Sequence, residues 1–196
     1  MNRDVERVEA PNPDPEEGMS AARGGTWIQT YTGRQFWPLD ARPEEVEIED
    51  IAHALAMLCR FNGHCLKFYS VAEHAVWVSR LVGAEDARWG LLHDAAEAYL
   101  SDLPKPIKAV LPEFHVWEER LLAVIAERFG LTGLPSGAVK EVDWRILANE
   151  KAALMAPHPA PWSGLPEPFP DVEIVGWSPS DAKSRFLERF RELFGE

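Results

Sequence analysis

Apolar positions recur with helical spacing over most of this chain. From Ile48 onward, positions 51, 55 and 58 are apolar, and a glycine at 63 follows them, which predicts a first core helix that ends near residues 61–63. Ser70 precedes Glu73 by three residues, as in a capping box, so a second helix should begin at Val71 and stop at Gly83.

The same spacing continues toward the C-terminus. Residues 91–108 open as an amphipathic helix, and residues 138–155 repeat the pattern. The last helix should begin at Ser178 and Pro179, an N-cap followed by proline at the first helical position. Two further apolar stripes complete the pattern: Trp117, Leu121, Val124, Ile125 and Phe129 before Gly130, and Phe186, Phe190 and Phe194 in the last helix.

Three segments have compositions that do not favour helices. Residues 26–40 are rich in threonine and aromatic residues around a glycine, which predicts a short hairpin or an extended arm. Residues 103–112 contain three prolines and should form a loop. Residues 156–171 contain six prolines and should wrap the surface. The pattern therefore predicts an all-α fold, a helical bundle with a short N-terminal arm and a proline-rich surface loop.

Composition changes this picture mainly at the N-terminus. The first 18 of the 196 residues hold six acids and three prolines, so residues 1–25 should form a disordered acidic tail before one domain over residues 26–196. A net charge of −12 argues against a nucleic-acid polymer as partner. No apolar stretch fits a membrane span or a signal peptide, so we expect a cytoplasmic protein, with both cysteines reduced packing residues.

Candidate chemistry begins with four ionisable residues in the segment that opens as a helix: His93, Asp94, Glu97 and Asp102. The spacing from His93 to Glu97 places both on one helical face, between leucines and alanines that should be partly buried. Buried charge is costly unless it is paired or bound to a metal. Taken alone, the His-Asp pair is equally consistent with a capped or salt-bridged surface feature.

Residues on other predicted helices favour a metal site. His74 lies one helix earlier and Asp143 two helices later, and helical bundles build metal sites from side chains that project inward from different helices. Two nitrogens and two oxygens suit Zn, Mn, Fe, Co or Ni better than Ca.

Three quoted stretches carry a resemblance: "YSVAEHA", "LLHDAAEAYLSDLPKPIK" and "VKEVDWRILANE". Together they resemble the HD-domain metal-dependent phosphohydrolases, close to the 5′-deoxynucleotidase branch, over about residues 60–150. The resemblance implies an HD-domain helical bundle that binds one divalent metal through its ordered H…HD…D signature. Its implied ligands are His74, His93, Asp94 and Asp143, with Glu97 and Asp102 as catalytic residues beside the attacking water. A further Mg or Mn ion could enter with the substrate.

Substrate contacts are expected from both the resemblance and side-chain chemistry. Arg60 stands where the family places an arginine, and a guanidinium can hold phosphate with two hydrogen bonds. His64 and Lys108 are second-rank phosphate candidates, and for His64 an ordinary loop histidine is an equal alternative. The "RFNGH" stretch departs from the arginine-tryptophan pair of the best-studied branch. Trp37 or Phe36 in the arm could stack on a base, although an aromatic residue in such an arm more often belongs to the core.

Three functions remain open from the sequence. The first is a 5′-deoxynucleotidase that releases orthophosphate from deoxynucleoside monophosphates. The second is a deoxynucleoside triphosphohydrolase that releases tripolyphosphate, with extra cations supplied by Arg34, Lys67, Lys105 and Lys108. The third is a nucleotide-binding module without turnover. A homodimer is expected from the resemblance and from the phenylalanine stripe of the last helix.

Overall fold

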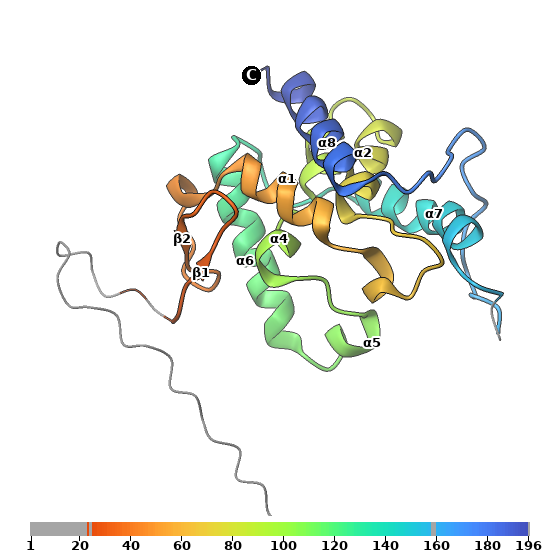
Figure 1. Ribbon diagram of the computed structural model, residues 1–196, viewed down its shortest axis with the longest axis horizontal. Helices are drawn as coiled ribbons and strands as arrows, with labels where there is room; N and C mark the ends of the chain where they lie inside the picture. The colour runs from red at the N-terminus through yellow and green to blue at the C-terminus, as the bar shows by residue number, and fades with distance from the viewer. Residues whose placement is uncertain (1–22, 24, 158–159, 196) are drawn as a thin grey trace, which may run out of the picture.

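Helices follow one another along nearly the whole chain, as the apolar spacing predicts. The computed structural model describes residue 23, residues 25–157 and residues 160–195; the predicted tail therefore lies almost entirely outside them. The described chain is mostly helical (Figure 1). Its helices are α1 (Ile48–Met57), α2 (Val71–Leu81), α3 (Ala87–Leu92), α4 (Glu97–Leu100), α5 (Lys105–Lys108), α6 (Pro112–Arg128), α7 (Gly137–Leu154) and α8 (Pro179–Phe194). Among the described helices, none combines the length and apolar character needed to cross a membrane.

The N-terminal arm forms a hairpin, which is one of the two alternatives that the sequence left open. Its strands β1 (Ile28–Gln29) and β2 (Gln35–Phe36) pair antiparallel, with Ile28 opposite Phe36. Phe36 is fully buried, and its ring stacks on Tyr99 of α4 at 3.9 Å between centroids. A short 3₁₀ turn, η1 (Pro43–Glu45), leads from the hairpin into α1. Phe36 is therefore the anchor that ties the arm to the helical core.

The main core lies where α1, α2 and α8 pack together (Figure 1). The phenylalanine stripe of α8 points into this core, because Phe186 and Phe190 are buried and Phe194 stacks on Phe190. The N-terminus of α8 is as predicted: the Ser178 hydroxyl accepts the Asp181 amide, and Pro179 follows the cap. Because the stripe packs inside the chain, the predicted homodimer rests on the resemblance alone.

The segment at 91–108 differs from its prediction. The helix α3 ends at Leu92, and residues 93–96 form tight turns before α4 begins at Glu97. In these turns the amides bond three residues back, as from Ala95 to Leu92 and from Glu97 to Asp94, which is 3₁₀ rather than α geometry. The predicted loop at 103–112 also contains the short helix α5, begun by Pro104 and Pro106, whose ring suits the first turn of a helix.

The first core helix ends earlier than predicted. After Met57 the chain becomes extended and then forms a 3₁₀ turn, η2 (Arg60–Gly63), in which Phe61 and Asn62 have φ of 55° and 54°. A glycine was the predicted stop, and Gly63 does adopt the left-handed conformation, with φ of 77°. The η2 turn is important because it carries Arg60.

The proline-rich segment contains no helix or strand among its described residues, as predicted. Asn149 of α7 anchors the C-terminal end of this segment through two hydrogen bonds. Its Nδ2 donates to the Phe169 carbonyl at 2.8 Å, and its Oδ1 accepts the Phe169 backbone amide at 2.9 Å. Farther along, the Glu73 carboxylate accepts the backbone amides of Gly176 and Trp177. Glu73 therefore makes only half of the predicted capping box and instead secures the approach to α8.

Candidate metal centre

Three helices bring the predicted metal ligands to one place. His74 lies in the first turn of α2, where the Ser70 hydroxyl accepts the Glu73 amide at 3.0 Å. His93 follows the last residue of α3. Both helices pack against each other, and α7, which carries Asp143, packs against α2. The short loops and helix contacts therefore place residues from distant parts of the sequence side by side.

The donor atoms of His74, His93 and Asp94 form a small triangle. The two histidine Nε2 atoms lie 3.3 Å apart, and Asp94 Oδ2 lies 3.3 Å from His93 Nε2 and 3.7 Å from His74 Nε2. Ligands held about 2.0–2.1 Å from one tetrahedral metal lie roughly 3.3–3.4 Å from each other. The three residues can therefore hold a metal ion with little rearrangement.

In both histidines Nδ1, the ring nitrogen that faces away from the donor triangle, has a hydrogen-bond partner. His93 Nδ1 lies 2.9 Å from the Gly90 carbonyl, which can only accept a hydrogen bond, so Nδ1 donates. His74 Nδ1 lies 2.7 Å from a Glu150 carboxylate oxygen. Such bonds orient both rings so that Nε2 faces the centre, as in known metal-ligating histidines.

Glu150 was missed by sequence reasoning. It is fully buried on α7, where it contacts both His74 and Arg60, whose Nη2 lies 3.2 Å away. Burial alone would raise the pKa of Glu150, but the positive charges of Arg60 and His74 outweigh it and lower the pKa. The available signal was its position seven residues after Asp143, two turns along the same helical face.

The predicted phosphate-binding Arg60 lies within this site. Its Nη1 is 3.6 Å from Asp94 Oδ2, so the guanidinium bridges Asp94 and Glu150. Burial alone would lower the pKa of Arg60, but these two carboxylates raise it instead. Within the described residues, the buried Nε of Arg60 has no hydrogen-bond partner. One donor of the guanidinium is therefore unpaired within the described chain.

Asp143 lies against the triangle. Its Oδ1 is 3.1 Å from His74 Nε2, and its side chain is 40% exposed. Burial would raise the pKa of Asp143, yet its hydrogen bond with His74 and the nearby histidine charges lower it. Asp143 can thus face both the centre and solvent, and its role as fourth ligand remains a prediction.

A second cluster joins the two acids that follow the triangle. Lys108 Nζ lies 3.3 Å from Asp102 Oδ1, 3.8 Å from Glu97 Oε1 and 2.8 Å from Glu118 Oε1. Burial, followed by the charges of Asp94 and Asp102, raises the pKa of Glu97 well above its ordinary value. Its Oε2 is buried without a hydrogen-bond partner in the described chain. Lys108 therefore pairs with both acids.

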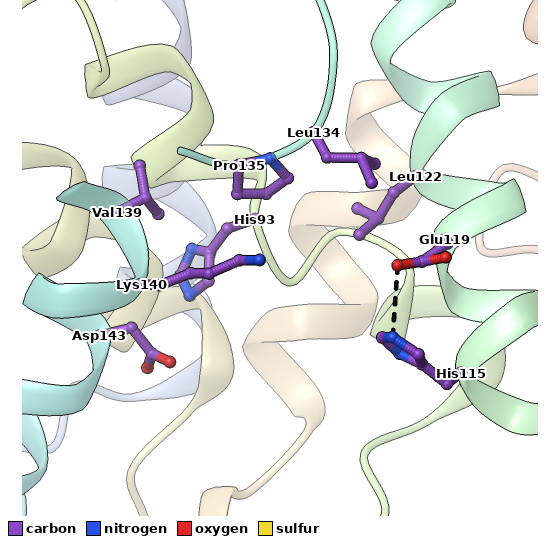
Figure 2. Close-up of a pocket in the computed structure, with 9 residues that line it drawn as sticks. All are labelled: His93, His115, Glu119, Leu122, Leu134, Pro135, Val139, Lys140 and Asp143. Atoms are coloured by element: carbon purple, nitrogen blue, oxygen red, sulfur yellow. Dashed lines mark ion pairs between the residues drawn. The ribbon is translucent and has the colours of Figure 1, made fainter. Parts of the chain in front are cut away.

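A pocket of about 160 Å³ opens beside the centre, between α6 and α7 (Figure 2). His93 and Asp143 form its inner wall, and Lys140 reaches across it. The other walls are mainly apolar, with an ion pair of 3.3 Å between His115 and Glu119 at one side. The apolar lining residues are Leu122, Leu134, Pro135 and Val139. A pocket of this volume resembles the cavities of about 150 Å³ that accept one aromatic ring.

The remaining predicted substrate contacts occupy other surroundings. Trp37 lies in the arm, where the Arg23 guanidinium stacks on its ring at 4.0 Å. His64 is exposed and follows the η2 turn, three residues after Phe61, whose carbonyl accepts its amide. Neither contact involves the donor triangle, so base stacking by Trp37 and phosphate binding by His64 remain predictions.

Comparison with known proteins identifies relatives of this chain. It is 40% identical over 171 residues to the uncharacterized protein YfdR of Escherichia coli (strain K12), which covers 86% of this chain and 96% of YfdR. The chain belongs to the YfdR family. An uncharacterized protein of Rhodobacter capsulatus is 39% identical over 124 residues, or 58% of this chain and 63% of that protein. No family model matches the chain.

Proposed function

We propose that this chain is a metal-dependent phosphohydrolase that converts deoxynucleoside 5′-monophosphates into nucleosides and orthophosphate. The observation that carries the proposal is the donor triangle, in which two oriented histidines and Asp94 converge beside the buried Glu97 and Arg60. The resemblance of the same residues to HD-domain phosphohydrolases supplies the reaction class.

The donor set fits a divalent transition metal. His74, His93 and Asp94 would hold the ion, with Asp143 completing the set, because imidazole nitrogens and carboxylate oxygens suit Zn, Mn, Fe, Co and Ni. When bound, such an ion polarises a phosphoryl oxygen and lowers the pKa of water. Glu150 and the Gly90 carbonyl keep the two histidines directed at it.

The other residues of the site have roles in phosphate binding and proton transfer. Arg60 donates its free Nε–H to a phosphate oxygen, and Lys108 adds positive charge near Glu97 and Asp102. Asp102 accepts the proton of the water that attacks phosphorus. Glu97, whose pKa is raised by burial and by the neighbouring acids, donates a proton to the leaving 5′ oxygen as the P–O bond breaks.

The placement of other cations favours a monophosphate over a triphosphate. Lys67 donates to the Ile174 and Val175 carbonyls, and Arg34 pairs with Glu47 at 2.6 Å. Two of the four cations that could serve a triphosphate thus have partners elsewhere in the chain. The pocket beside His93 and Asp143 would receive the nucleoside.

Two substitutions test the assignment. Asp94→Ala should lose both bound metal and turnover, because it removes a ligand. Glu97→Gln should keep the metal and lower kcat by about 10²–10⁴-fold, because it removes only the proton donor. Metal content and released orthophosphate are measured on the same samples. Full turnover by Asp94→Ala would contradict the metal assignment, and equal metal loss in both variants would make Glu97 a ligand.

A substrate panel separates the three candidate functions. The metal-loaded protein is incubated with deoxynucleoside mono- and triphosphates, and the products are identified. Orthophosphate from monophosphates supports the proposal. Tripolyphosphate from dATP with dAMP untouched would establish the triphosphohydrolase instead, and tight nucleotide binding without product under several metals would indicate a binding module.

A further inference from the structure

Two cysteines enclose the turn that carries Arg60. Cys59 directly precedes η2 and Cys65 lies two residues after it, and their sulfurs are 3.5 Å apart. Both thiols are free and half-buried. A disulfide has an S–S length of about 2.05 Å, so bond formation requires the sulfurs to approach by only about 1.5 Å. The pair is thus close enough for a bond within one chain.

The backbone around the pair is already closed on itself. Cys59 pairs with Ser70 in an isolated antiparallel bridge, and the Arg60 amide donates to the Tyr69 carbonyl at 2.9 Å. The Cys65 thiol also lies 3.9 Å from the Arg60 carbonyl. The two sulfurs therefore contact each other, and the Cys65 sulfur also contacts the backbone of the arginine that bridges Asp94 and Glu150.

The segment between the cysteines is conformationally costly. Phe61 and Asn62 have positive φ, and left-handed backbone is unfavourable for a bulky residue such as Phe61. A covalent bond across the base of this loop would restrict the opening of the turn. Neither cysteine belongs to the donor triangle. Bond formation between the two thiols therefore does not depend on any reaction proposed at the metal centre.

We propose that Cys59 and Cys65 form a reversible modification site, at which a peroxide converts the two thiols into a disulfide that fixes the Arg60 turn. One thiol attacks the peroxide, which cleaves the O–O bond, leaves a sulfenic acid and releases water. The second thiol then displaces the sulfenic oxygen as a second water. Two thiols and one hydrogen peroxide thus give one disulfide and two waters, and a dithiol reductant reverses the change.

The oxidised form should be more stable than the reduced form. Closing a loop of seven residues restricts the unfolded chain, and for a protein of this size the expected rise in Tm is about 5 °C. The bond should form within one chain, because each sulfur already contacts the other. Metal content should not change, since neither cysteine belongs to the donor triangle.

The test treats the full chain with hydrogen peroxide and compares it with untreated and re-reduced samples. We expect a monomer that has lost two hydrogens by mass spectrometry, no thiol reactive toward Ellman's reagent after denaturation, and a higher Tm that dithiothreitol reverses. The matched controls are Cys59→Ser and Cys65→Ser, which should show no peroxide-dependent rise in Tm. Two reactive thiols after treatment, a disulfide between chains, or the same rise in either serine variant would overturn the proposal.

Discussion

The pKa values of two buried glutamates beside the centre are shifted in opposite directions. Arg60 and His74 outweigh the effect of burial on Glu150 and lower its pKa, so Glu150 remains charged. Glu97 lies beside Asp94 and Asp102, and burial together with these negative charges raises its pKa well above the ordinary value. Glu150 therefore orients the His74 ring as a carboxylate, whereas the raised pKa of Glu97 suits the proton-donor role that we propose for it.

Lys108 provides a test of the Glu97 proton. Its positive charge, 3.8 Å from Glu97 Oε1, favours the glutamate anion. Replacement by methionine should raise the pKa of Glu97 further, because the anion loses that stabilisation. If protonated Glu97 is the acid, activity is lost as pH rises through its pKa. The alkaline limb of the kcat/KM profile should then move to higher pH in Lys108→Met.

The control for this shift is Lys105→Met on the same short helix. The Lys105 ammonium lies over the Trp144 ring at 4.6 Å, and its loss should leave the alkaline limb in place. An unchanged limb in Lys108→Met, or an equal shift in both variants, would mean that Glu97 does not set the alkaline limb.

The sequence predicted individual site residues more reliably than their partners. His74, His93 and Asp94 could be named because their residue types are metal ligands, and the structure brings them together. Glu150 could not be named, because a glutamate within an amphipathic helix is usually a solvated charge. Only the position of His74 on another helix shows that Glu150 is buried and bonded.

At the scale of elements, the close approach of α2 and α3 sets the distance between the two histidines. Gly90 lies in α3 opposite Ser79 of α2, where an added Cβ would be 2.8 Å from the Ser79 Cα. The Gly90 carbonyl also accepts the His93 Nδ1–H. A single glycine therefore permits the helix packing and positions one ligand.

Gly90→Ala should separate the two helices and displace His93 from His74. We expect a loss of unfolding free energy of about 1–3 kcal/mol, as for other overpacked sites, together with weaker metal binding. Denaturant unfolding and metal titration measure the two effects.

Gly137→Ala is the matched control, because an added Cβ at this first residue of α7 meets no atom within 4 Å. It should change stability by no more than about 1 kcal/mol, in the stabilising direction, and leave metal binding unchanged. Wild-type metal affinity in Gly90→Ala would show that the close approach does not position the ligands.

Element prediction succeeded where local signals agreed and failed where tertiary contacts decided. The N-caps Ser70 and Ser178 both bond as their sequences indicated. The break after Leu92 carries no proline or glycine, so the helical spacing continued through it in the sequence. In the folded chain, tight turns at 93–96 place His93 and Asp94 toward the same centre, which a continuous helix would not favour for adjacent residues.

At the scale of the whole molecule, the N-terminal arm completes the core around α1 and α4. The first described contacts come from Arg23, which pairs with Glu45 and stacks on Trp37. Phe36 then fills a buried position against Tyr99. The sequence left open whether the arm was a hairpin or an extended strand, because two-residue strands have little pattern of their own. The arm is therefore part of the fold rather than an appendage.

Two truncations distinguish the arm from the residues before it. Removal of residues 1–18 should leave Tm, metal content and activity unchanged, because this acidic segment has little apolar surface to bury. Removal through residue 37 should destabilise the protein strongly, since it deletes Phe36, and Phe36→Ala alone should reduce the unfolding free energy by about 3–5 kcal/mol. Thermal unfolding of the three variants gives the comparison. Loss of activity in the shorter truncation would place residues 1–18 in the functional site, whereas a stable Phe36→Ala variant would show that the arm is not anchored through this ring.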